Sequence, residues 1–408
     1  MRVTREAELA EAIAGATGPL KVQGGGTRDI GRPVTGELLE VGLSGVELYE
    51  PGALTLVVQA GTPIAEIETL LAGEGQRLAF EPMDHRALLG TTGVPTIGGV
   101  VAANVSGPRR IQAGAARDFA LGARFVDGTG RIVKNGGRVM KNVTGYDLVK
   151  LLAGSWGTLG VLTEVSLKVL PIPETEATLT LSGLDEVRAV EAMAAALGSP
   201  WDVTGAAHGV LGPDAKTQLR IEGSEASVAY RAQRLTDHLA PFGPVALEAD
   251  PARSREIWRR LRDVEPFADR PFVARVSLKP TDLAEMLYAF GQVFFDPETR
   301  APLCDVSVDW GGGLAWIAAR EDQLVEAAKV SPEAGADPAA LGARLMFASL
   351  QSHFEAVSGH ATLVKAPLAT RAEVSVFQPQ PAPLATIARG LKQKFDPRGI
   401  LNPGLMGA

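Results

Sequence analysis

Three glycine-rich segments, each beside an apolar stretch of strand length, most constrain the fold of this chain. They lie at residues 24–26, 90–107 and 154–160. Glycine lets the backbone adopt positive φ and lets a ligand or a second backbone segment approach closely. Strands that lead into glycine loops, with predicted helices between them, indicate an α+β fold whose loops approach a ligand.

The first segment, Gly24-Gly25-Gly26-Thr27, follows a predicted strand at Leu20–Gln23. Successive backbone N–H groups can point at one phosphate when no Cβ atoms intervene. The segment is not a Gly-x-Gly-x-x-Gly turn that opens a helix, which disfavours a Rossmann site, and it lacks the Gly-Lys-Ser/Thr of a triphosphate loop. Taken alone, it fits a generic tight turn as well as a phosphate site.

A run of small residues at positions 96–107 forms part of the second segment, with Asn104 and Ser106 near its end. A helix of the core would carry larger side chains, whereas a flat cofactor that lies against the backbone requires small ones. We therefore expect this run to contact a ligand. Arg117-Asp118 then precedes a predicted strand at residues 121–126.

The triplet Pro171-Ile172-Pro173 marks the predicted boundary between two domains. Proline at alternate positions interrupts a strand ladder and stiffens a linker, and a chain of 408 residues is long enough for two or three domains. We assign residues 1–172 to a first domain of two α+β subdomains, residues 173–384 to a second domain, and residues 385–408 to a C-terminal segment.

Within the second domain, the order strand, helix, strand, strand, helix, strand is predicted twice, and this order is ferredoxin-like. The strands of the first copy are at residues 177–181, 203–207, 217–221 and 245–248. Those of the second copy are at residues 272–279, 305–309, 314–318 and 360–365. Two such copies side by side predict one broad antiparallel sheet with helices on one face, although two generic α+β patterns would look similar.

Composition excludes several classes of protein. The 40 basic and 47 acidic residues give a net charge of −7, which argues against a nucleic-acid-binding surface. Cys304 is the only cysteine, so the chain forms no internal disulfide and cannot hold an iron–sulfur cluster by itself. We find no apolar run of transmembrane length and no signal peptide, and expect a cytoplasmic location with inner-membrane contact only through partners.

Three further motifs carry a specific resemblance. They are Lys141-Asn142-Val143-Thr144-Gly145-Tyr146-Asp147-Leu148, Gly157-Thr158-Leu159-Gly160-Val161 and Gly399-Ile400-Leu401-Asn402-Pro403-Gly404. Together with the glycine segments they resemble the FAD-linked oxidase superfamily of vanillyl-alcohol oxidase and p-cresol methylhydroxylase (PCMH). The stretch from Ser106 to Asp118 and the segment Gly359-His360-Ala361-Thr362-Leu363 are similar to the FAD-binding E subunits of glycolate oxidases.

This resemblance implies a PCMH-type FAD-binding domain, a cap domain, and a C-terminal segment that returns to the FAD domain. It implies FAD as the cofactor. The residues that it assigns to FAD binding are Gly24, Gly25, Gly26, Thr27, Gly98, Gly99, Asn104, Ser106, Gly107, Asp118, Gly160, Val161 and Asn402. Covalent members attach FAD through histidine or cysteine; no histidine lies beside the first glycine segment, so we expect non-covalent FAD.

Oxidation of a 2-hydroxy acid requires a base for the hydroxyl proton and a cation for the carboxylate. Among the five histidines, His360 is the best candidate for a residue near the flavin, although a structural role is the alternative for each of them. The related catalytic subunits and D-lactate dehydrogenases carry a metal-binding His-x-His-x-Gly-Asp-Gly-Asn pattern. This chain lacks it, which weakens the case for independent catalysis, and we expect no metal site.

Three functions remain open at this point. The first is an FAD-binding subunit of a heteromeric glycolate oxidase, with a second FAD-linked flavoprotein and an iron–sulfur protein as partners. The second is a stand-alone FAD-dependent D-2-hydroxy-acid dehydrogenase that acts on D-lactate or glycolate. The third is a scaffold that retains the fold without redox chemistry, which the intact glycine segments disfavour.

Overall fold

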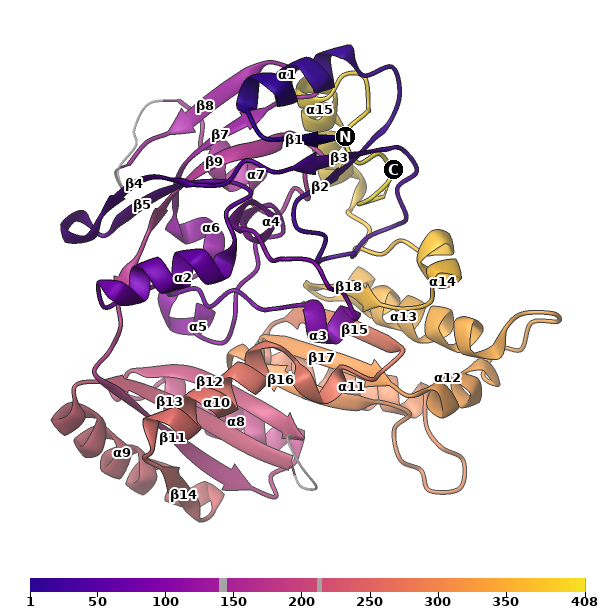
Figure 1. Cartoon of the computed structure of the whole chain (residues 1–408). Coiled ribbons are helices and arrows are strands. Elements are labelled where there is room, and N and C mark those ends of the chain that lie inside the picture. The colour runs from indigo at the N-terminus through magenta and orange to yellow at the C-terminus, as the bar shows by residue number, and fades with distance from the viewer. Residues whose placement is uncertain (139–144, 211–214, 408) are drawn as a thin grey trace.

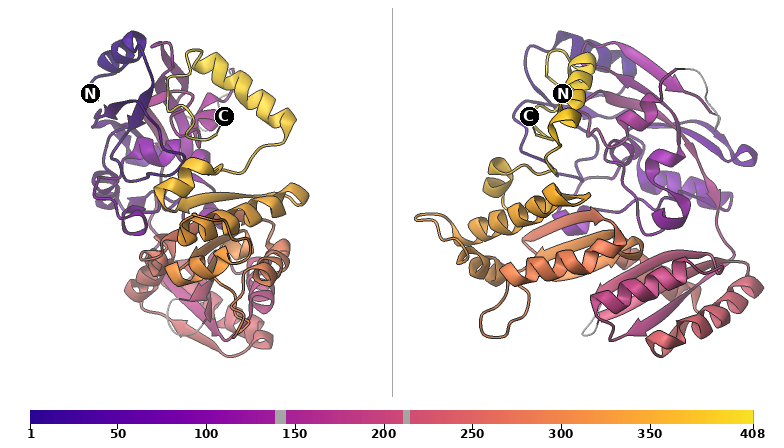
Figure 2. Two further views of the ribbon diagram at one scale, coloured as in Figure 1. Left: turned by 90° about the vertical axis from the view of Figure 1, so that its right-hand side faces the viewer. Right: turned by 180° about the vertical axis from the view of Figure 1, so that it is seen from behind.

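The computed structural model describes residues 1–138, 145–210 and 215–407. Lys141, Asn142, Val143 and Thr144 of the family-like motif therefore lie outside the described residues. Figures 1 and 2 show an N-terminal domain stacked on a cap domain, with the C-terminal helix against the N-terminal domain. Among the helices of the described ranges, none combines the length and apolar character needed to cross a bilayer.

The N-terminal domain contains two α+β subdomains, as predicted. Three parallel strands form the first sheet, in the order β1 (Arg2–Val3), β3 (Glu37–Val41) and β2 (Leu20–Gln23). Helix α1 (Glu6–Gly15) buries Leu9 and Ile13 in the same small core as Leu39. This side of the domain therefore fixes β2 and the glycine loop that follows it.

A five-stranded antiparallel sheet forms the second subdomain. Its spatial order is β4 (Val46–Glu50), β5 (Thr55–Gln59), β9 (Val161–Lys168), β7 (Ala120–Val126) and β8 (Ile132–Gly136). The helices of this subdomain are α2 (Ile64–Gly73), α3 (Arg86–Leu89), α4 (Ile97–Ala102), α5 (Arg110–Ala113), α6 (Ala116–Phe119) and α7 (Leu148–Leu152). The apolar side chains of β5 and β9 pack with those of α2 and α4 in one core.

The cap contains the predicted broad sheet. Its eight strands run in the order β14 (Val245–Glu248), β11 (Thr175–Ser182), β13 (Ala215–Gly223), β12 (Val203–Val210), β16 (Asp305–Asp309), β17 (Leu314–Ala319), β15 (Phe272–Leu278) and β18 (Gly359–Lys365). Numbered within each copy, this order is 4-1-3-2 followed by 2-3-1-4. The two ferredoxin-like halves therefore join antiparallel through their second strands, where His208 pairs with Val308.

Helices cover both faces of the cap sheet. The four helices of the repeats are α8 (Glu186–Leu197), α9 (Glu225–Leu239), α11 (Leu283–Val293) and α13 (Pro338–Ala356). Alternate residues of β11 distinguish the faces: Leu179 packs in the core with α8 and α9, whereas the Thr178 hydroxyl accepts a hydrogen bond from the Trp258 indole of α10 (Pro251–Arg262). Short α12 (Glu321–Ala328) and α14 (Leu368–Glu373) complete the cap.

Two strands meet at the assigned domain boundary. The strand β10 (Leu170–Pro171) pairs with β6 (Gln76–Arg77), and β11 begins four residues after β10 ends. At the other end, α15 (Ala382–Phe395) leads into a segment whose Ile400 carbonyl accepts a hydrogen bond from the Leu20 amide. The C-terminal residues thus extend the β2 side of the N-terminal domain.

A buried network of ion pairs connects the two domains. Glu81 and Arg109 come from the N-terminal domain, and Arg220 and Glu222 come from β13 of the cap. Arg220 makes a two-pronged contact with Glu81 at 2.9 and 3.0 Å, and Arg109 makes one with Glu222 at 2.8 and 2.8 Å. Arg109 also reaches Glu81, and Arg77 reaches Glu222 at 2.7 Å, so five groups form one connected cluster.

Candidate functional site

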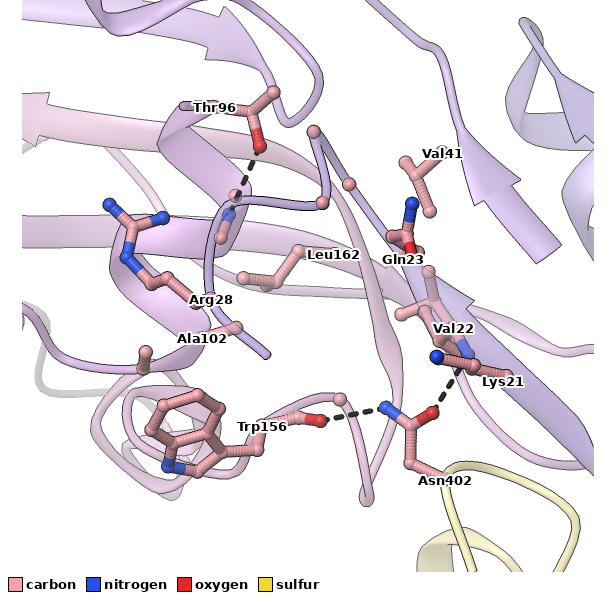
Figure 3. A pocket seen from close by; sticks show the side chains of 18 of the residues that line it. Lys21, Val22, Gln23, Arg28, Val41, Thr96, Ala102, Trp156, Leu162 and Asn402 are labelled. Atoms are coloured by element: carbon pink, nitrogen blue, oxygen red, sulfur yellow. Dashed lines mark hydrogen bonds between the residues drawn. The ribbon is translucent and has the colours of Figure 1, made fainter. Parts of the chain in front are cut away.

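A cleft in the N-terminal domain collects most of the predicted cofactor residues (Figure 3). The cleft is partly open to solvent. Nine of the thirteen predicted residues line it: Gly24, Gly25, Gly26, Thr27, Gly98, Gly99, Gly160, Val161 and Asn402. Segments that are far apart in the sequence therefore converge on one site.

The loop after β2 presents backbone N–H groups to this cleft. Within the described part of the chain, the amides of Gly24, Gly25, Gly26 and Thr27 donate no hydrogen bond to another residue. Gly26 has a φ of +68°, in the region where glycine is favoured. Four successive amides without internal partners form a concave donor surface of the kind that binds anions.

The second glycine of the loop is required by packing. A Cβ atom on Gly25 would lie 1.6 Å from the carbonyl oxygen of Val94, and one on Gly93 would lie 1.7 Å from the carbonyl oxygen of Gly25. The two backbone segments therefore touch directly. This contact fixes the loop against the residues that precede α4, and it explains glycine at position 25 without invoking the ligand.

Residues 97–102 form the helix α4, although we expected their small side chains to disfavour a core helix. The large apolar side chains and the glycines lie on different faces of this helix. Ile97, Val100 and Val101 are at most 1% exposed in the core, whereas Gly98 and Gly99 line the cleft. A Cβ atom on Gly98 would meet Ala60 at 2.7 Å, so the helix approaches β5 closely. One side thus anchors the helix, and the other leaves room for a flat ligand.

Four predicted residues lie outside the lining of the cleft. Their side chains or carbonyls instead organise the backbone around α5 and α6. The contacts are Arg117 N–H to Asn104 Oδ1 at 3.0 Å, Ala116 N–H to Ser106 Oγ at 2.9 Å, Ala115 N–H to Asp118 Oδ2 at 2.9 Å, and the Trp310 indole N–H to the Gly107 carbonyl at 3.0 Å. We do not include these four among the residues proposed to contact the cofactor.

Asn402 closes one end of the cleft (Figure 3). Its side chain accepts a hydrogen bond from the Val22 amide at 2.7 Å and donates one to the Trp156 carbonyl at 2.9 Å. Asn402 is 5% exposed and has a φ of +43°, which asparagine tolerates better than most residues. It therefore ties the C-terminal segment to β2 and to the turn that contains Trp156.

Sequence reasoning missed Arg28, which follows directly after the glycine loop. Its side chain extends along the cleft toward α4, where a Cβ atom on Gly99 would lie 3.2 Å from Nη1. Its buried Nε atom has no hydrogen-bond partner among the described residues. Burial lowers the pKa of Arg28 to about 10, so the group remains a cation at neutral pH. An unsatisfied buried donor on a cation indicates an anionic ligand group in this cleft.

The comparison with known proteins identifies the family. The chain is 33% identical to "Glycolate oxidase subunit GlcE" of Escherichia coli K12 over 411 residues, which covers 98% of this chain and 96% of that protein. The chain belongs to the GlcE family. A family model described as "FAD binding domain" matches residues 1–136, which include the loop at Gly24 and the helix α4. FAD is accordingly its cofactor, and the chain is an FAD-dependent oxidoreductase.

Another relative of this GlcE-family chain matches a shorter stretch of the sequence. "Glycolate oxidase subunit GlcD" of Bacillus subtilis is 39% identical over 126 residues, covering 31% of this chain and 25% of that one. Among solved structures, alkyldihydroxyacetonephosphate synthase superposes with a TM-score of 0.68 at 16% identity, over 99% of this chain and 76% of the other. That structural likeness extends the fold assignment to the cap.

The cleft fits FAD in its chemistry. The free amides of the Gly24–Thr27 loop and the cation of Arg28 suit the pyrophosphate and other electron-rich groups. The small residues Gly98, Gly99, Ala102 and Ala103 leave a flat surface. The residues that line the cleft, within the described ranges, include neither histidine nor cysteine. This lining supports our expectation that the GlcE-family chain holds FAD without a covalent bond.

Two histidines, His360 of the cap and His85 of the N-terminal domain, lie outside the cleft lining. His360 is exposed on β18 and pairs with Ser277 of β15. Desolvation, followed by the charges of Arg275 and Arg110, lowers the pKa of His360, so the imidazole is neutral at pH 7. His85 is buried, and burial followed by the charge of Arg28 lowers its pKa to about 3. His360 lies outside the cleft lining, and its catalytic role stays a prediction.

No group of three or more histidine, cysteine, aspartate or glutamate side chains in the described ranges has the geometry of a metal site. Cys304 is half-buried in the cap, away from the cleft lining, and burial raises the pKa of its thiol to about 12. At neutral pH it is therefore a protonated, unreactive side chain.

Proposed function

We propose that this chain is the FAD-binding subunit of a heteromeric glycolate oxidase or dehydrogenase. The complex would oxidise glycolate, a 2-hydroxy acid, to glyoxylate and pass the electrons onward. Similarity along the full length to a protein named as a glycolate oxidase subunit carries this proposal. The converging glycine loops and the cation of Arg28 support it, because they supply a site for the cofactor.

The residues of this chain would hold and orient the cofactor. The amides at Gly24–Thr27 would bind the pyrophosphate, and the small face of α4 would accept the ring system. FAD, when bound, supplies the acceptor for the hydride that leaves the hydroxyl-bearing carbon. Asn402 would keep the turn at Trp156 in place beside it.

Onward electron transfer requires other chains. An iron–sulfur cluster needs several thiolates, and Cys304 is the only cysteine. We therefore propose an iron–sulfur subunit and a second FAD-linked flavoprotein as partners; the similarity to a GlcD protein supports a common origin for the two flavin-binding domains. The complex would work in the cytoplasm and reach the membrane only through its partners.

The test is a visible spectrum of the purified chain, followed by anaerobic addition of glycolate and D-lactate. We expect a flavin spectrum at one FAD per chain that stays oxidised alone and bleaches when the two partner subunits are present. Purified chain without stoichiometric flavin would favour the scaffold function instead. Flavin that is not reduced by glycolate even in the assembled complex would refute the proposed substrate.

A second candidate function is a stand-alone FAD-dependent 2-hydroxy-acid dehydrogenase. A partial match supports it: "D-lactate dehydrogenase" of Anaerostipes hadrus is 44% identical over 86 residues, 21% of this chain. Rapid bleaching of the isolated chain by either acid would select this function over the heteromeric one.

A further inference from the structure

Two arginines, one from each domain, flank one tryptophan where the cap sheet faces the N-terminal domain. The guanidinium carbon of Arg275 lies 5.1 Å from the centroid of the Trp310 ring and 6.0 Å from that of Trp316. The guanidinium carbon of Arg110, from α5, lies 4.4 Å from the same Trp310 ring. Because Trp310 also donates a hydrogen bond to the Gly107 carbonyl, this cluster spans the two domains.

Neither arginine has a carboxylate partner. Most arginines of the cap pair with acidic residues, as Arg270 does with Asp305 at 3.0 Å. Among the described residues, no aspartate or glutamate lies within salt-bridge distance of Arg275 or Arg110. Burial, followed by the charge of Arg110, lowers the pKa of Arg275 to about 10, so it is still a cation at neutral pH. Two cations on one indole ring, without a described carboxylate in salt-bridge distance, favour the binding of an anion.

Two carboxyl groups act on these arginines electrostatically, Asp309 on Arg275 and Asp118 on Arg110, but among the described residues neither forms an ion pair with them. Asp309 is within electrostatic reach of Arg275, but its carboxylate accepts a hydrogen bond from the Trp310 amide at 2.7 Å. Burial raises the pKa of Asp309 to about 7, so the carboxyl group is only partly ionised at neutral pH. Within the described structure, acidic groups therefore compensate the charge of the two arginines only in part.

The strand register places polar groups next to the arginines. Arg275 pairs with Thr362 of β18 on one side and with Trp316 of β17 on the other. Ser277, two residues along, pairs with His360. Cross-strand partners and residues two apart share one face of a sheet, so this face combines a cation, an imidazole and aromatic walls.

A charge on this face and a charge in the FAD cleft both act on one buried histidine. The charges of Arg28, which lines the cleft, and of Arg275, on the cap, both lower the pKa of the buried His85. The Nδ1 atom of His85 lies 3.3 Å from the Met83 carbonyl oxygen, which leaves its other ring nitrogen without a hydrogen-bond partner among the described residues. Arg28 donates a hydrogen bond to the same Met83 carbonyl at 3.4 Å, which links the cleft lining to His85.

We propose that Arg275 and Arg110 bind the carboxylate of a small hydroxy acid where the cap meets the N-terminal domain, so that this subunit has its own anion site. A planar guanidinium fork matches a carboxylate, and the indole rings of Trp310 and Trp316 limit the ligand to a small molecule. This inference rests on the proposed function in one respect, which is that FAD occupies the cleft of the N-terminal domain.

The test uses the FAD-loaded full-length chain and three probes: glycolate, oxalate and, as a neutral analogue, ethylene glycol. Binding is measured by calorimetry and by the change in the flavin absorbance. We expect both acids to bind and ethylene glycol not to bind. Arg275→Met and Arg110→Met should each weaken oxalate at least ~10-fold, as the loss of a charge-assisted contact does.

The matched control is Arg320→Met, at the end of the same sheet. Arg320 is 46% exposed and contacts Asp322 at 3.2 Å, so its loss should leave oxalate affinity unchanged. Arg275→Lys keeps the charge without the fork and should fall between wild type and Arg275→Met; it also decides the question if Arg275→Met does not fold.

Several outcomes would overturn the inference. Oxalate affinity that is equal in Arg275→Met, Arg110→Met and wild type would do so. A holoprotein that binds neither acid would refute the anion site while leaving the proposed function intact, because flavin content reports that function separately. If the two variants bind oxalate normally but fail to co-purify with a partner subunit, the arginines serve an acidic partner surface instead.

Discussion

Glu222→Gln tests whether the ion-pair network between the domains stabilises the protein. Glutamine keeps the volume of the side chain but removes its charge and one acceptor oxygen. In the wild type, Glu222 is 4% exposed and accepts two hydrogen bonds from Arg109 and one from Arg77. The substitution would leave Arg77, Arg109 and Arg220 with Glu81 as their nearest acidic partner.

The magnitude follows from this geometry. Removal of one member of a buried ion pair costs about 3–5 kcal/mol, because the remaining charge stays desolvated. The network is fully formed in the native state: burial alone would raise the pKa of Glu222, but the charges of Arg220, Arg109 and Arg77 and the Arg109 hydrogen bonds hold it far below its ordinary value. We therefore expect Glu222→Gln to lower the free energy of unfolding by about 3–5 kcal/mol at pH 7.

Urea unfolding followed by fluorescence measures this effect. With a slope of about 2–3 kcal/mol per molar urea, the midpoint should fall by roughly 1–2 M. The difference from wild type should persist above about pH 4.5 and shrink as the pH falls, since a depressed carboxyl pKa stabilises only where the unfolded group is ionised. The control Glu191→Gln removes an exposed partner of Arg188 and should cost under about 1 kcal/mol. Equal costs for the two variants would show that the network adds nothing beyond a surface pair.

Three further substitutions follow from the site and its surroundings. Gly25→Val should abolish FAD retention, because its Cβ would lie 1.6 Å from the Val94 carbonyl oxygen. The control Gly18→Val has open space around its Cβ and should retain FAD. The flavin-to-protein ratio of the purified variants measures retention, and FAD retained by Gly25→Val would refute the loop assignment. Asn402→Ala removes two hydrogen bonds from a buried residue and should cost about 2–4 kcal/mol and loosen the C-terminal segment; unchanged stability and unchanged proteolysis there would contradict this. Asp309→Asn should flatten the pH dependence of the free energy of unfolding. Burial raises the pKa of Asp309 to about 7, so the wild-type protein should lose up to about 4 kcal/mol of stability as the pH rises from 4 to 7. Parallel curves of stability against pH for the wild type and the variant would refute this.

The cofactor cleft was predictable because its chemistry is local in the sequence. Gly24, Gly25, Gly26 and Thr27 directly follow one strand. A run of glycines can be recognised in the sequence without knowing which segment packs against it. The repeated cap topology was equally accessible, since each strand and helix has its own periodicity. The helix at residues 97–102 was harder to predict, because its six residues supply both a large apolar face for the core and a small face for the cleft.

The residues that sequence reasoning missed depend on contacts between distant segments. Arg109 and Glu222 are 113 positions apart, and nothing around either one indicates a buried partner. Arg275 had a weak local signal: it is a charged residue on an apolar strand, where Phe272, Val273, Ala274 and Val276 are fully buried. Only the strand register and the position of α5 show that this charge meets Arg110 and Trp310.

Adjacent residues couple the ion-pair network to the proposed anion site. Arg109 belongs to the network, and Arg110, the next residue, flanks Trp310. The Trp310 indole in turn holds the Gly107 carbonyl just before them. The network therefore fixes the start of α5 against the cap sheet, and this fixes where the Arg110 guanidinium lies relative to Arg275. A carboxylate that bridges two arginines from different domains requires such an anchor, since small shifts between the domains would separate the two cations. The buried ion pairs of the interface thus position the two arginines relative to each other. A purely apolar interface would allow the domains to slide and would hold the arginines less well.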